Sequence, residues 1–101
     1  MEYSRKLNDQ SCDIDISGRF TREDSEQIQS LVSYINEHKV TILHINMQKL
    51  DFIDSSAIGQ LLVLKEEIDK NKGSITLKNP TGHVKEMLDV SNFEQFFNIV
   101  E

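Results

Sequence analysis

The chain has 101 residues, of which 38% are hydrophobic and 28% are charged, and its net charge is −6. This balance is typical of a globular protein and excludes a disordered one. A general nucleic-acid binder needs a basic patch that displaces counterions from phosphates, so the acidic balance argues against that class. It argues equally against electrostatic attachment to anionic lipid. We therefore expect a single domain, residues 1–101, that binds neither nucleic acid nor a membrane surface directly.

The single cysteine, Cys12, permits no internal disulfide and no cysteine zinc cluster, which suits a reducing cytoplasm. No apolar run is long enough to span a membrane, and the residues Met1–Lys6 lack the apolar core of a signal peptide. The sequence therefore predicts a cytoplasmic protein without direct membrane insertion. A monomer is the default expectation for its oligomeric state.

The first part of the chain predicts a hairpin and a helix. Residues 3–7 and 12–17 are the two strands, and the turn-forming residues 8–11 lie between them. In the second strand apolar and polar residues alternate, so one face is expected to be buried. Thr21 is the predicted N-cap of a helix that ends near His38. The apolar stripe of this helix comprises Ile28, Leu31, Val32 and Ile35.

The second part of the chain predicts alternating strands and helices. Residues 40–47 form the clearest strand, and its mostly apolar composition predicts a central strand with both faces covered. A helix runs from about Ser56 to Asn71, and Asn71–Gly73 are expected to close it in the left-handed conformation. Its apolar side comprises Ala57, Ile58, Leu61, Leu62, Leu64 and Ile68. The remainder predicts a strand over 74–78, a helix over 81–90, a helical turn over 91–97 and an edge strand over 98–101.

This order of elements predicts an α/β (α+β) fold. Right-handed crossovers would place about four helices largely on one side of a mixed sheet of four to five strands.

Asp51–Gly59 is the stretch around which the other elements are arranged. It contains an acid, Asp54, and two hydroxyls, Ser55 and Ser56, immediately before the long helical pattern. Ser55 or Ser56 is expected to cap that helix, and Asp51 and Asp54 are expected to be solvated loop carboxylates. On a helical wheel Ser56, Gly59 and Val63 share the side away from the apolar face, so they form a candidate contact patch.

No pattern in the chain predicts catalysis, a metal or a cofactor. His38, His44 and His83 lie in different predicted elements, without zinc-ligand spacing. The glycines form neither of the phosphate-binding patterns G-x-x-x-x-G-K and G-x-G-x-x-G. We therefore expect a binding protein rather than an enzyme.

The segment Asp54–Gly59 resembles the central motif of the STAS family, the anti-sigma-factor antagonists and their relatives. The residues before it, Leu43–Asn46, Leu50 and Phe52–Ile53, are similar to the strand and loop that precede the motif in the family. Further matches are Gly18, Asn79–Pro80 and the helix that carries Val84, Met87 and Leu88. The resemblance covers nearly the whole chain. Two features depart from the family pattern: Ala57 replaces a glycine, and Arg19–Thr21 replaces an acidic-apolar-Asp segment.

The resemblance implies a phosphorylation switch in which Ser55 is the acceptor. In the family the unphosphorylated protein binds a serine kinase or anti-sigma-type regulator, and a cognate phosphatase restores that form. A phosphate at a helix N-terminus would meet free backbone N–H groups, so the fold would tolerate it. Ser56 is the rival acceptor because of its expected exposure. The predicted partner-binding residues are Asp51, Asp54, Ser55, Ser56, Gly59 and Val63.

Two other functions stay open. The first is a stand-alone STAS subunit of an ABC-type transport complex, for instance one that moves phospholipids. The second is nucleotide binding or hydrolysis, which the glycine pattern does not support. The regulated output of a switch could be a sigma factor or another process such as biofilm or envelope control. Neighbouring genes for a kinase or phosphatase would favour the switch, and genes for a permease and an ATPase would favour transport.

Overall fold

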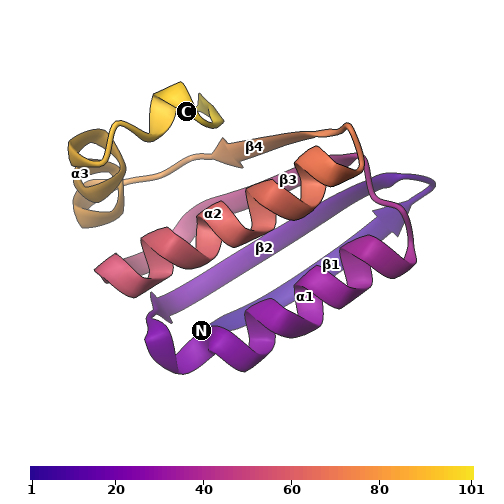
Figure 1. Ribbon diagram of the computed structural model, residues 1–101. Helices are drawn as coiled ribbons and strands as arrows, with labels where there is room; N and C mark the ends of the chain where they lie inside the picture. Colours follow the sequence, from indigo (N-terminus) through magenta and orange to yellow (C-terminus); the bar gives the residue numbers. More distant parts are fainter.

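One mixed sheet of five strands forms the frame of the molecule (Figure 1). The computed structural model describes residues 1–101. The strands lie in the order β1-β2-β3-β4-β5; β1 is antiparallel to β2, and the other neighbours are parallel. Their bounds are β1 Glu2–Asn8, β2 Ser11–Phe20, β3 Ile42–Ile53, β4 Ser74–Lys78 and β5 Asn98–Val100. The predicted α+β fold with a mixed sheet is confirmed.

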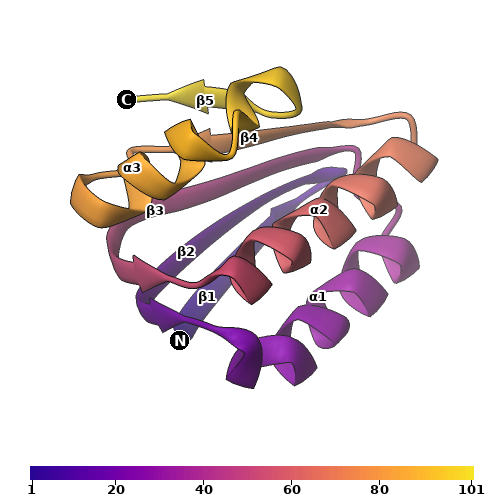
Figure 2. The ribbon, with the colours of Figure 1, turned by 60° about the vertical axis from the view of Figure 1, so that its left-hand side comes forward.

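Two long helices lie side by side on one face of this sheet (Figure 2). A third helix lies near the end of β3. The three helices are α1 Ser25–Glu37, α2 Ser55–Lys70 and α3 Gly82–Val90. Two 3-10 turns, η1 Arg22–Asp24 and η2 Phe93–Gln95, complete the chain. The fourth expected helix is therefore only the turn η2. Asn92 precedes it at φ 55, so the chain leaves helical geometry between α3 and the turn.

The core is a cluster of 23 buried hydrophobic residues between the helices and one face of the sheet. The stripe of α1 is confirmed, with Ile28, Leu31 and Ile35 buried and Val32 partly buried. In α2, Leu62 departs from the prediction, because it is 36% exposed. It follows Leu61 by about 100° around the helix axis and so turns away from the line of contact with the sheet.

The prediction that the third strand has both faces covered is wrong. Along β3 the buried Leu43, Ile45 and Met47 alternate with His44 and Asn46, which are only partly buried. The helices therefore cover one face alone, and the other face is polar. A parallel strand usually has both faces covered, but the alternation in this strand matches a half-exposed sheet.

β3 also extends six residues beyond its predicted end at Met47, to Ile53. Two irregularities in its pairing with β2 explain the difference, one near Ser17 and one at Gly18. Each sets an extra residue of β3 against β2 and shifts the phase of the buried side chains, so that Leu50 and Ile53 face the core. Gly18 has φ +84, a conformation that L side chains rarely adopt. β2 accordingly continues past its predicted end at Ser17 to Phe20.

Gly73 closes the α2–β4 connection for a reason other than the predicted one. The left-handed residue is Lys72, at φ 60, whereas Gly73 lies directly against the backbone of Thr41. A Cβ atom at Gly73 would come within 2.6 Å of the Thr41 carbonyl carbon. The glycine is therefore required by close approach of two backbones.

We predict that Gly73→Ala lowers the free energy of unfolding by about 1–3 kcal/mol, because the backbone of Thr41 must move. Gly59→Ala is the matched control, since nothing lies within 4 Å of a Cβ atom there. It should raise the free energy of unfolding by about 0.5–1 kcal/mol through helix propensity. Urea unfolding measures both changes, and equal effects of the two variants would contradict the close approach.

Cys12 provides a test of the core. Its side chain is fully buried, and burial, followed by repulsion from Asp13, raises the pKa of its thiol. Because only the thiolate is nucleophilic, we predict that a disulfide reagent modifies Cys12 roughly 100-fold more slowly in the folded chain than in the urea-unfolded chain. A rate that does not change on unfolding would show that β2 is open to solvent.

Candidate functional site

Asp54 caps α2 and determines the conformation at its start. This residue is extended (φ −105°, ψ 178°), and its Oδ1 accepts a hydrogen bond of 2.8 Å from the Ala57 N–H. The expectation that Ser55 or Ser56 caps the helix is therefore wrong. A carboxylate at this position accepts the N–H bond and also favours the positive end of the helix dipole. Both serines are left exposed in the first turn of α2.

Asp54 also forms hydrogen bonds that join a second segment, residues 20–22, to the start of α2. Asp54 Oδ2 accepts a hydrogen bond of 3.2 Å from the Arg22 N–H, and the Asp54 N–H donates to the Phe20 carbonyl at 3.3 Å. Gln60, one turn into α2, donates from Nε2 to the Thr21 carbonyl at 3.1 Å. Three hydrogen bonds thus join the end of β2 and η1 to the junction of β3 and α2. We call this region the Asp54 corner, comprising residues 19–22 and 52–56.

Phe52 is the aromatic centre of the Asp54 corner. The Arg19 guanidinium lies 4.2 Å from its ring centroid, a cation–π contact. The His83 ring stacks on it at 4.9 Å with an interplanar angle of 2°. His83 Nε2 is also 3.1 Å from the Ile53 carbonyl oxygen, so it connects the start of α3 to the end of β3. Sequence reasoning gave His83 no role here, because the three residues meet only in the folded chain.

The predicted contact residues are all exposed or half-buried. Asp51, Ser55, Ser56 and Gly59 are exposed, Val63 is 37% exposed, and Asp54 is half-buried. Asp51 belongs to β3 rather than to the expected loop. Along α2 the spacing from Ser56 to Gly59 and Val63 places these three on one side. The exposed Leu62 beside Val63 adds apolar surface, although the helical period predicts Leu62 on the buried side of α2.

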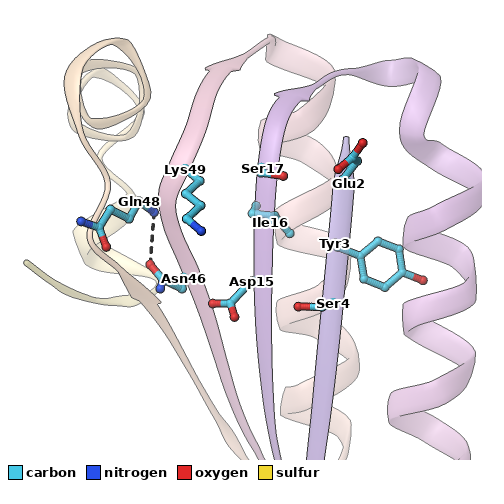
Figure 3. Close-up of a pocket in the computed structure, with 9 residues that line it drawn as sticks. All are labelled: Glu2, Tyr3, Ser4, Asp15, Ile16, Ser17, Asn46, Gln48 and Lys49. Carbon is cyan, nitrogen blue, oxygen red and sulfur yellow. Dashed lines mark hydrogen bonds between the residues drawn. The ribbon is translucent and has the colours of Figure 1, made fainter.

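A hollow lies on the open face of the sheet, opposite α2 (Figure 3). It is lined by polar side chains of β1, β2 and β3, including Asp15, Asn46 and Lys49. Polar groups on this face bind one another. Asn46 Oδ1 accepts from the Gln48 N–H at 3.1 Å, and Asn79 Nδ2 donates to it at 3.3 Å.

The three histidines make separate contacts. His44 Nδ1 lies 3.2 Å from Asp13 Oδ1 on the open sheet face, His38 packs against Tyr34, and His83 stacks on Phe52. No group of three or more His, Cys, Asp and Glu side chains has a geometry that could hold a metal ion. None of the helices has the length and apolar character that a membrane crossing requires.

The fold is that of the anti-sigma factor antagonist SpoIIAA and related domains. SpoIIAA in its unphosphorylated form matches with a TM-score of 0.75 and 22% identity, over 99% of this chain and 87% of that one. The phosphorylated Bacillus SpoIIAA matches with a TM-score of 0.76 and 20% identity, over 99% and 92%. A sulfate transporter family protein from Wolinella succinogenes matches with a TM-score of 0.73 and 16% identity, over 87% and 74%.

The sequence comparison defines the family. Residues 4–101 match the model described as "Mlab, STAS domain", so the chain belongs to the STAS-domain family. A STAS-domain containing protein of Pseudomonas aeruginosa (strain UCBPP-PA14) is 36% identical over 55 residues. That match spans 54% of this chain and 54% of the relative. The predicted family is therefore confirmed.

We predict that Asp54→Ala lowers the free energy of unfolding by about 1–2 kcal/mol, because both carboxylate hydrogen bonds of the corner are lost. Asp54→Asn keeps an oxygen that can cap α2, so it should retain most of the stability. Asp51→Ala, at an exposed position, should change stability by no more than about 0.5 kcal/mol. Urea unfolding of the three variants tests this order; equal losses for Asp51→Ala and Asp54→Ala would contradict the capping role.

Proposed function

We propose that the chain is a phosphorylation-controlled protein–protein switch in which Ser55 accepts the phosphoryl group. The observation that carries this proposal is that Asp54 provides the cap, which leaves the exposed Ser55 free of a structural role at the start of α2. Next to it, the side of α2 with Ser56, Gly59 and Val63 offers a partly apolar contact surface. Unphosphorylated Ser55 would lie within that contact as a small neutral group.

A phosphate on Ser55 would act on a partner mainly through charge. It carries about −1.5 to −2 charges near neutral pH. Burying an unpaired charge in an interface costs several kcal/mol, which is enough to shift an equilibrium between bound and free states almost completely. The half-buried Asp54 and exposed Asp51 would add to the repulsion felt by an acidic partner. The fold is similar to both the phosphorylated and the unphosphorylated form of SpoIIAA, which supports a switch that needs no refolding.

The implied partners are a serine kinase or anti-sigma-type regulator and a phosphatase that restores the hydroxyl. In this scheme the chain supplies only the acceptor, and the catalytic base, magnesium and nucleotide belong to the kinase. We propose that it acts in the cytoplasm as a monomer. The output could be a sigma factor or another process such as biofilm control.

The alternative is that the chain is a STAS subunit of an ABC-type transport complex. The description of the matching family model and the likeness to a sulfate transporter family protein favour it. In that case the same exposed side of α2 would bind a transporter ATPase, and a phosphate on Ser55 would not be needed for the exchange of partners.

We predict that the tagged chain, purified from its native host, carries one phosphoryl group in a fraction of molecules and that Ser55→Ala abolishes it. Intact-mass spectrometry measures this fraction. Ser56→Ala is the matched control, one residue along the same exposed turn, and should keep the modification. Unchanged labelling of Ser55→Ala would show that the acceptor is wrong.

The proteins that co-purify separate the two functions. A kinase or anti-sigma-type regulator that binds wild type and is lost with Ser55→Glu supports the switch. An ABC-type ATPase that binds wild type and Ser55→Glu equally would support the transport alternative instead.

A further inference from the structure

The two arginines of the Asp54 corner have no carboxylate partner. The cations of the chain's ion pairs are the Met1 amino group, His44, Lys65, Lys70 and Lys85. No arginine is among them. Arg19 and Arg22 instead line an open hollow of about 430 Å³ together with Phe52 and Asp54. In a chain with net charge −6, this places two unpaired guanidinium groups in a hollow with Asp54, the residue before the proposed acceptor.

Two of the three acids that share this hollow are already bound, and the third, Glu23, is exposed and forms no ion pair. The Asp24 carboxylate accepts from the Thr21 N–H at 2.8 Å, and that of Asp54 accepts from the Ala57 and Arg22 N–H groups. The arginine side chains are therefore available to another anion. Arg19 is held on the Phe52 ring, and the Arg22 backbone is held at this corner by its hydrogen bond to Asp54.

A phosphate on Ser55 would need such a cation. Asp54 already takes the Ala57 N–H, so the start of α2 offers a phosphate fewer free donors than an uncapped helix would. The phosphate would also follow directly after the Asp54 carboxylate in the chain, and two like charges this close repel each other strongly. Guanidinium groups bind phosphate through two parallel hydrogen bonds, which suits them to offset this repulsion.

We propose that Arg19 and Arg22 form a phosphate clamp, which binds the phosphoryl group of Ser55 within the chain and stabilises the phosphorylated form. This inference rests on the proposed function, because it assumes that Ser55 is the acceptor. Arg22 is within reach because its N–H bonds to the residue before Ser55, and Arg19 because it contacts Phe52, three residues before Ser55. The clamp would cover both arginines at the moment that Ser55 gains its negative charge.

The test uses chain with phosphoserine installed at position 55 during synthesis, so no kinase is required. Phosphorus-31 NMR follows the second ionisation of the phosphate, whose pKa is about 6 when unperturbed. The charged groups of the hollow are Arg19, Arg22 and the Met1 amino group as cations and Glu23, Asp24 and Asp54 as acids, and His83 lies across Phe52. The Met1 amino group is paired with Asp24 at 2.9 Å, and Asp51 is a further acid near the end of β3. R19Q/R22Q removes the clamp, and R5Q is the matched control because Arg5 packs on Tyr34 of α1 instead.

We expect the titration midpoint to lie about one pH unit lower in the native sequence and in R5Q than in R19Q/R22Q, because nearby cations favour the dianion. Phosphorylation should also raise the urea midpoint of the native sequence and lower that of R19Q/R22Q, where repulsion from Asp54 is unopposed. The unphosphorylated variants are unfolded in parallel to confirm that each folds.

Equal titration midpoints in all three chains would overturn the clamp, whatever their stability. If the titration shows the clamp but no kinase phosphorylates the chain in its host, the clamp is supported and the proposed switch is wrong. The two failures are therefore distinguishable.

Discussion

The carboxylate of Asp54 is the constraint on which the surface of the site depends. One oxygen caps α2 and the other binds η1, so two segments 32 residues apart in sequence share one anchor. A serine hydroxyl in the same place has a single oxygen, which would have to accept both N–H hydrogen bonds or leave one donor without a partner. The aspartate satisfies both and leaves the following hydroxyls unused. A modification of Ser55 can then change the surface while the contacts that hold the corner remain.

The location of this corner follows from the topology of the sheet. β2 and β3 are parallel neighbours, so their carboxyl ends lie at the same edge, and loops from that edge meet in open α/β sheets. The two irregularities in their pairing bend the end of β3 and place Phe52 where Arg19 and His83 can reach it. The polar face of the sheet, in contrast, is a broad surface whose groups bind one another, as His44 binds Asp13.

Periodicity predicted those parts of the molecule that depend on local sequence. The stripe of α1 and the exposed position of Gly59 and Val63 follow from the helical repeat alone, and both are confirmed. The end of β3 could not be predicted, because a bulge reverses the alternation on which strand prediction depends. The sequence predicts a serine cap rather than Asp54 because Ser and Asp are nearly equivalent at that position. The contacts of Arg19 and His83 with Phe52 join three distant elements, and no local pattern reveals them.

Net charge is a poor guide to the chemistry of this corner. The whole chain is acidic, yet salt screens exposed charges beyond about 8 Å, so a group at Ser55 responds mainly to its immediate neighbours. Those neighbours include the Asp54 carboxylate, whose two oxygens each accept a hydrogen bond, and the guanidinium groups of Arg19 and Arg22, which have no ion partner. Without phosphate, such a surface presents a partner with two accessible positive charges. With phosphate, the clamp would cover them and add negative charge at the same point. A partner that recognises the first arrangement would therefore lose an attraction and meet a repulsion in one step, although the backbone beneath is unchanged.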